Sequence, residues 1–248
     1  MLNELYLIAD QLDYVQRGRV RAQVRESHLE RNSKTCDFTK ASQEKFSGLE
    51  DWLNAELAER VKAHPAHGWF SRVKGIGDVN IGKVIGLIDI EKASQVSKLW
   101  RYAGFGCNGD GKAERRQAGE KLHFNMTLKV MCWRLAKSLI RAKGAYYAYY
   151  LGQKAKLAER EQTNGRVIVP SAELPKVKGK HVENDEFVGL GHVDMMAMRK
   201  MTKLFLSHLW VEWRKAEGLE ITEPYAQGIL GHSSYLDPWE FIEKPRKP

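Results

Sequence analysis

The sequence has few cysteines, and those present form no motif. Only three occur in 248 residues, Cys36, Cys107 and Cys132, and no two of them stand at C-x-x-C spacing. An odd number without that spacing argues against a secreted disulfide framework and against a zinc cluster. His64 and His67 lack a third ligand at a known spacing. We therefore expect a protein of a reducing cytoplasm, with no metal site and no cofactor.

Long apolar runs are also missing. No stretch approaches 18 uninterrupted apolar residues, and the N-terminus shows no charged-then-apolar leader, so we expect neither a membrane segment nor a targeting peptide. The sequence is nevertheless 43% hydrophobic and holds seven tryptophans. That composition is enough to bury the core of one large domain or two small ones.

Positive charge is abundant, and it is unevenly distributed. The formal net charge is +9 at pH 7. Residues 1–67 hold 10 Lys/Arg against 11 Asp/Glu, whereas the remainder holds 30 against 20. A basic body attracts polyanions by Coulomb forces and counterion release. Nucleic acid is therefore the first candidate partner.

Helical periodicity dominates the chain and predicts an all-α fold. Apolar residues recur every three or four positions from Leu2 to about Arg31, and again from Phe46 to Val61. These two segments predict an antiparallel helical hairpin or coiled-coil arm over 1–67, able to pack on the body or to pair with a second copy in a homo-oligomer. Further helices are expected near Phe124–Leu139 and over His192–Ala216. We assign 68–217 to the body, 162–190 to an irregular insertion with a short hairpin around Val167–Val169, and 218–248 to a tail.

A glycine-linked motif begins the body. It reads F-S-R-V-K-G-I-G-D-V-N-I-G-K-V-I-G-L-I from Phe70 to Ile88 and predicts a helix-hairpin-helix. Its glycines permit a tight turn and leave backbone amides free to meet a phosphate oxygen at the next helix start. Asp78 complicates that interpretation, because a carboxylate there would cap the same amides. The alternative is a plain turn whose glycines only allow close packing.

A cationic segment follows. Between Gly111 and Lys143 basic residues outnumber Glu114 and Glu120 by nine to two, and Arg134, Lys137 and Arg141 have the spacing of one helix face. A charge run can also be a merely solvated face.

The tyrosines from Tyr146 to Tyr150 could stack on bases, although we favour packing. The predicted nucleic-acid-binding residues are Lys74, Gly75, Ile76, Gly77, Lys83, Lys112, Arg115, Arg116, Lys121, Lys129, Arg134, Lys137 and Arg141.

The order of these motifs resembles a known family. V-K-G-I-G (Val73–Gly77), L-W-R-Y-A-G-F (Leu99–Phe105), F-N-M-T-L-K-V-M-C-W-R-L-A (Phe124–Ala136) and V-D-M-M-A-M-R-K-M-T-K-L (Val193–Leu204) resemble the C-terminal half of insertion-sequence transposases of the IS one-ten family. Those enzymes join a carboxylate (DEDD) domain, through a coiled coil, to a transposase domain. The resemblance implies DNA binding, with structured RNA as a second ligand.

Two departures argue against catalysis. The resemblance starts at the arm, so the four metal-binding carboxylates of the family have no counterpart here. Residues 98–137 contain no serine, although the family places its nucleophilic serine there. Without that hydroxyl a seryl-DNA link cannot form.

We therefore expect no catalytic residues and a non-catalytic, largely sequence-independent protein that binds double-stranded DNA, an accessory factor of a mobile element, phage or plasmid in the cytoplasm. Two alternatives stay open. One is a recombinase, transposase or nuclease subunit completed by a partner, and the other is an RNA-binding or protein-interaction factor.

Overall fold

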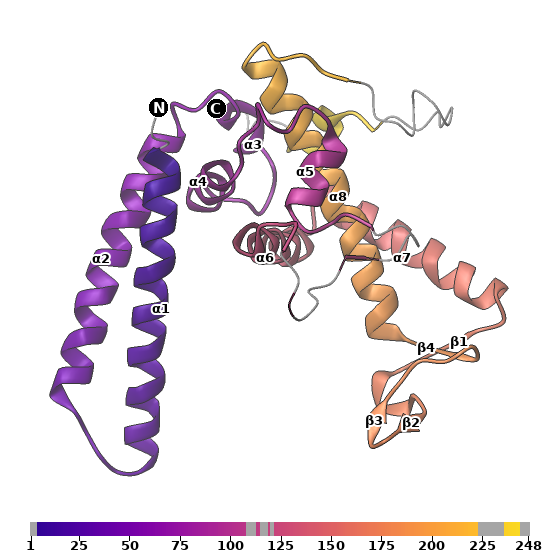
Figure 1. Cartoon of the computed structure of the whole chain (residues 1–248), viewed down its shortest axis with the longest axis horizontal. Helices are drawn as coiled ribbons and strands as arrows, with labels where there is room; N and C mark the ends of the chain where they lie inside the picture. The colour runs from indigo at the N-terminus through magenta and orange to yellow at the C-terminus, as the bar shows by residue number, and fades with distance from the viewer. Residues whose placement is uncertain (1–3, 108–112, 115–118, 120–121, 223–235, 244–248) are drawn as a thin grey trace. The chain divides into compact units, whose positions relative to one another are not determined.

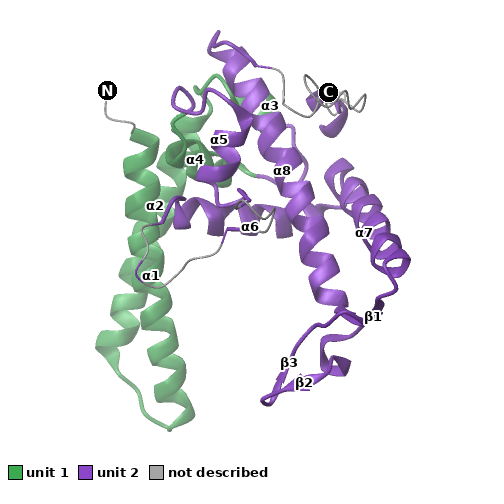
Figure 2. Ribbon diagram, turned by 45° about the vertical axis from the view of Figure 1, so that its right-hand side comes forward, with its two compact units in different colours: residues 1–71, 77–89 green, residues 72–76, 90–248 purple. Residues whose placement is uncertain are grey.

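The computed structural model describes residues 4–107, 113–114, 119, 122–222 and 236–243. Helices dominate it (Figure 1), which confirms the all-α expectation apart from two small two-stranded sheets. The chain forms two compact units (Figure 2): unit 1 comprises residues 1–71 and 77–89, and unit 2 comprises residues 72–76 and 90–248. None of the described helices has both the length and the apolar character needed to cross a bilayer.

Unit 1 is built on the predicted helical hairpin. Helices α1 (Glu4–Arg31) and α2 (Asp37–Val61) run side by side in opposite directions (Figure 1), followed by the single turn α3 (His67–Phe70). Leu12 and Leu57 of the hairpin are fully buried, as the apolar spacing predicts. Helix α4 (Asp78–Leu87) packs on both α1 and α2.

Small residues let α4 approach the hairpin closely. A Cβ on Gly82 would lie 2.5 Å from Cγ of Leu57, and one on Gly86 would lie 2.7 Å from the carbonyl oxygen of Leu5. The second contact is with backbone, which cannot swing aside. The glycines of α4 therefore serve packing within unit 1.

Unit 2 is a set of helices gathered around α8. Its helices are α5 (Val96–Tyr102), α6 (Met126–Ala142), α7 (Ala145–Thr163) and α8 (Leu190–Ala216), followed by the short 3-10 helix η2 (Pro238–Phe241). Helix α8 packs on α5, α6 and α7. Its Trp210 is fully buried and donates from Nε1 to the carbonyl of Ala93 at 2.6 Å.

The segment between α7 and α8 contains the strands. β1 (Val167–Val169) pairs in parallel with β4 (Phe187–Gly189), whereas β2 (Lys176–Val177) and β3 (Lys180–His181) form an antiparallel hairpin after the 3-10 turn η1 (Ser171–Glu173). The hairpin predicted at Val167–Val169 is therefore wrong: that strand pairs with a distant one, and the hairpin lies further along.

A buried tyrosine and histidine lie between α7, α8 and η2. The hydroxyl of Tyr146 is 2.8 Å from Nδ1 of His208, and the ring of Phe241 is 4.9 Å from each of their rings. Burial raises the pKa of Tyr146 and lowers the pKa of His208 to about 4. The imidazole is therefore neutral at pH 7.

Replacing His208 by glutamine should flatten part of the acid dependence of stability. Because the native pKa lies below the ordinary value of about 6.5, the unfolded chain takes up a proton between pH 6.5 and 4 and the native chain does not. Stability is therefore lost as pH falls through that window, by up to about 3 kcal/mol from this one group. Urea unfolding at several pH values measures this loss of stability. If the free energy of unfolding depended on pH in the same way in wild type and in His208→Gln, the lowered pKa of His208 would be contradicted.

Candidate nucleic-acid interface

The glycine turn is defined first by packing. Gly75 has φ +89° and its carbonyl accepts a hydrogen bond from Ser138 Oγ at 2.7 Å. A Cβ there would lie 2.5 Å from the Cβ of Ala142 and 3.1 Å from the carbonyl oxygen of Ser138. Ile76 is buried. These contacts with α6 support the packing interpretation for Gly75 and Ile76, and the helix before the turn, α3, has only four residues.

Gly77 stands in a different environment. It is the exposed N-cap of α4, no side chain caps the helix among the described residues, and nothing lies within 4 Å of a Cβ built on it. The Asp78 carboxylate, which we expected to cap this helix, instead lies 2.9 Å from Nε2 of His67. The first amides of α4 are therefore left without a side-chain acceptor.

The two lysines of the motif are each engaged locally. Lys74 forms an ion pair with Glu243 at 3.0 Å within unit 2. Lys83 donates to Oε1 of Gln16 at 3.3 Å within unit 1. Each lysine beside the turn therefore already has a polar partner within its own unit.

Helix α6 carries the clearest cationic surface of unit 2. Asn125 begins the helix by accepting from the amide of Leu128 at 3.1 Å, and the helix contains no acidic residue. At 3.6 residues per turn, Arg134, Lys137 and Arg141 fall within about 60° of arc. Leu128, Leu135 and Leu139 on the opposite face are buried. We call Arg134, Lys137 and Arg141 the α6 strip.

An exposed aromatic ring borders the α6 strip. Trp133 is 47% exposed, and Nζ of Lys137 lies 5.6 Å from its ring centroid. Val130, one turn earlier, is also exposed. Neither Arg134 nor Arg141 forms an ion pair with another described residue. Arg134 and Arg141 therefore present charge that no described carboxylate pairs with, which suits a phosphate backbone. Lys137 is half-buried, and its charge contributes to lowering the pKa of Asp194.

Lys129 lies apart from the α6 strip. Its Nζ is 4.3 Å from the ring centroid of Phe124. Its pKa is lowered, first by burial and then by the nearby charge of Arg199. This predicted site residue therefore belongs to a second group of cations.

Helix α8 supplies the rest of that group, which the sequence prediction missed. Arg199 donates from Nη2 to the carbonyls of Phe105 and Gly106, both at 2.7 Å. Nζ of Lys203 lies 3.9 Å from the ring centroid of Trp100, and its pKa is lowered by burial and by Arg199. In the sequence, these cations were indicated only by the R-K-M-T-K run, which lies in a segment whose other residues mainly predict a buried helix.

The tyrosine run is mostly internal, as expected. Tyr146 and Tyr150 are buried, and Tyr150 donates to the Asp194 carboxylate, which also pairs with Lys154 at 2.8 Å. These rings are used in packing. Lys112, Arg115, Arg116 and Lys121 lie outside the described residues.

No group of three potential metal ligands occurs within the described ranges. Comparisons of the chain with family models, with curated proteins and with solved structures found no match.

Proposed function

We propose that this chain binds double-stranded DNA through its phosphates, with little dependence on sequence, and that it does not itself cut or join strands. The α6 strip carries the proposal: it places three cations on one helix face, with Arg134 and Arg141 exposed and Lys137 half-buried, and the helix contains no carboxylate. Residues 122–158 as a whole contain seven Lys/Arg and no Asp/Glu. Such a surface attracts phosphates and releases condensed counterions when it binds them.

The dimensions of the strip suit a phosphate backbone. From Arg134 to Arg141 the helix rises about 10 Å at 1.5 Å per residue. That span equals about three base-pair steps of 3.4 Å measured along the duplex axis. Cations of this kind position a protein on DNA without reading its bases. Weak sequence dependence follows from the same chemistry.

Neutralising the α6 strip should weaken binding to every duplex alike. In Arg134→Gln/Lys137→Gln/Arg141→Gln three phosphate contacts are lost, which lowers the affinity about 100-fold at about 0.15 M salt. The matched control is Arg21→Gln/Arg25→Gln/Lys34→Gln, which removes three exposed cations from the arm. Gel shifts with two unrelated duplexes, a single strand and a structured RNA measure the effect.

The same gels separate the alternatives. Equal affinity of wild type and strip variant for duplex DNA would contradict the proposal. Preference for the RNA would favour an RNA-binding factor instead. Strand nicking with Mg²⁺ would favour a recombinase or nuclease subunit, and salt-independent absence of binding would favour a protein-interaction factor.

A further inference from the structure

The β2–β3 hairpin is a basic projection at the end of unit 2 where α7 ends and α8 begins (Figure 1). Residues 176–181 read K-V-K-G-K-H, and residues 174–182 contain no acidic residue. All six residues of the hairpin are exposed. Lys176, Lys178 and Lys180 form no ion pair with any residue in the described part of the chain. The sequence prediction placed these lysines in an irregular segment.

The tip of the hairpin is a rigid two-residue turn. Lys178 has φ +50° and Gly179 has φ +76°. Positive φ at both central residues is the signature of a type I′ turn, whose twist matches that of the flanking strands. Lys178 therefore stands at a fixed tip rather than on a loose loop.

The register distributes the cations around the ribbon. Lys176 pairs with His181, and Val177 pairs with Lys180. Since successive residues of a strand point to opposite faces, Lys176 lies on one face and Lys180 on the other. With Lys178 at the tip, positive charge surrounds the hairpin on both faces and at its end.

The base of the hairpin is closed by hydrogen bonds. The amide of Val182 donates to the carbonyl of Pro175 at 2.9 Å, and Nδ1 of His181 lies 2.8 Å from the carbonyl oxygen of Leu174. Leu174 itself is buried. The ribbon therefore stands on an ordered support.

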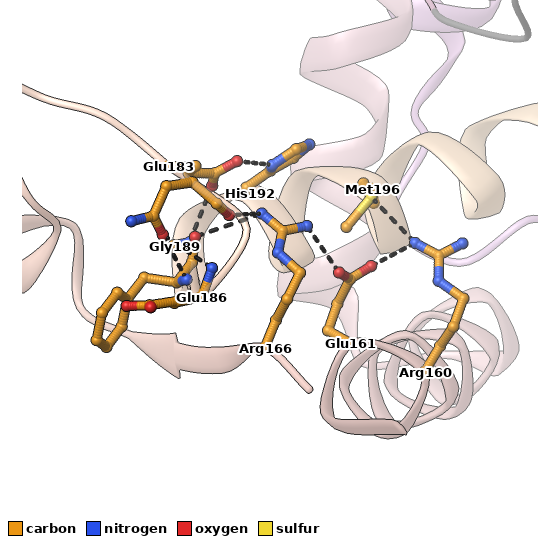
Figure 3. Close-up of polar contacts among 10 residues, drawn as sticks. Arg160, Glu161, Arg166, Glu183, Glu186, Gly189, His192 and Met196 are labelled. Carbon is orange, nitrogen blue, oxygen red and sulfur yellow. Dashed lines mark hydrogen bonds and ion pairs between the residues drawn. The ribbon is translucent and has the colours of Figure 1, made fainter. Parts of the chain in front are cut away.

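Ion pairs attach that support to the helices (Figure 3). Glu161 of α7 is buried and holds both Arg160, at 2.6 Å, and Arg166, at 2.9 Å. Arg166 also donates to the carbonyls of Asn184 and Phe187 at 3.0 and 3.3 Å.

A second carboxylate joins the support to α8 (Figure 3). Glu183 accepts from the amide of Gly189 at 2.9 Å and lies 2.6 Å from Nδ1 of His192. The hairpin is thus held at its base by residues of both α7 and α8.

We propose that the β2–β3 hairpin enters the major groove of B-form duplex DNA, tip first. In a groove, phosphates line both walls, so a ribbon with cations on both faces meets both walls at once. A flat anionic surface would engage only one face. The proposal rests on the duplex binding proposed above and identifies a second contact for it.

Dimensions favour the major groove of a B-form duplex. Two strands lie about 4.8 Å apart, and the groove, about 12 Å wide, admits a two-stranded ribbon. From Pro175 to Lys178 the chain extends about 10 Å at 3.3 Å per residue, slightly more than the groove depth of about 8.5 Å. The major groove of A-form RNA is too narrow for such entry.

The carboxylates next to the β2–β3 hairpin determine which end of it can approach DNA. Asp185 and Glu186 are exposed and follow β3 toward the base of the ribbon. Like charge repels them from phosphate, whereas the lysines at the tip are attracted. The segment is therefore polarised so that its tip, not its base, faces the duplex.

The test uses Lys176→Gln/Lys178→Asn/Lys180→Gln in the full chain. Asn-Gly is the preferred type I′ sequence, so this variant keeps the turn while losing three charges, and an unchanged circular dichroism spectrum and melting temperature verify its fold. Affinity is measured for B-form DNA, for double-stranded RNA and for DNA whose cytosines carry glucosylated 5-hydroxymethyl groups that fill the major groove. Arg21→Gln/Arg25→Gln/Lys34→Gln is again the control.

We expect the hairpin variant to lose about 100-fold in affinity for B-form DNA at about 0.15 M salt. Its affinity for double-stranded RNA and for the glucosylated DNA should stay within about threefold of wild type, because the ribbon cannot enter the major groove of either. An equal loss on all three ligands would overturn groove entry. No loss on B-form DNA, with the α6 strip variant still impaired, would overturn the hairpin contact alone, and failure of wild type to bind any duplex would overturn both proposals.

Discussion

Gly75→Ala should destabilise the protein by about 2–5 kcal/mol. Left-handed backbone costs a non-glycine residue about 1–2 kcal/mol, and Gly75 has φ +89°. The new methyl would also lie 2.5 Å from the Cβ of Ala142 and 3.1 Å from the carbonyl oxygen of Ser138. Overpacking of this kind adds about 1–3 kcal/mol. Denaturant unfolding measures the change.

Gly77→Ala provides the matched control two residues later. Nothing lies within 4 Å of a Cβ at Gly77, and its φ of −97° suits any residue. The loss of a glycine N-cap should cost no more than about 1 kcal/mol. Equal destabilisation by the two substitutions would contradict the packing explanation of the turn.

Glu161→Ala should be the other clearly destabilising substitution, at about 1.5–3 kcal/mol, because the protein loses charge-assisted hydrogen bonds from two arginines. Glu161 is 4% exposed and is the carboxylate partner of both Arg160 and Arg166. Without Glu161, Arg166 (25% exposed) loses its carboxylate partner, whereas Arg160 (54% exposed) stays largely hydrated. The pKa of Glu161 is lowered, chiefly by the hydrogen bond from Arg160. Its stabilising effect is therefore present at neutral pH and is lost as pH falls through that lowered pKa.

Glu159→Ala is the control for this position. Glu159 lies on the same helix and is exposed, so its removal should change the free energy of unfolding by no more than about 0.5 kcal/mol. Thermal unfolding of both variants makes the comparison. If Glu161→Ala were as stable as Glu159→Ala, the ion-pair network would not support the β2–β3 hairpin.

Periodicity predicted the long helices well. The apolar spacing from Leu2 to Arg31 corresponds to α1 (Glu4–Arg31), and the segment predicted from His192 to Ala216 corresponds to α8 (Leu190–Ala216). In both, a buried stripe at three- and four-residue spacing is a local property of the sequence. The shared face of the α6 strip followed from the same geometry.

Long-range contacts could not be predicted in this way. The packing of Gly75 on Ser138 joins residues 63 apart, and nothing local distinguishes such a glycine from one that faces solvent. Likewise, β1 pairs with a strand that begins 20 residues later. The β2–β3 hairpin was not predicted because its strands have two residues each. In addition, its Lys178-Gly179 turn is not one of the strongest hairpin signals. Tertiary context decided each of these features.

The salt dependence of duplex binding measures how many phosphates the α6 strip contacts. If the α6 strip meets three phosphates, the slope of log K against log salt should be at least as steep as about −2.7 for wild type, and shallower by about 2.7 in Arg134→Gln/Lys137→Gln/Arg141→Gln, on unrelated duplexes alike. A wild-type slope near zero, or identical slopes for the two proteins, would contradict phosphate binding by the α6 strip.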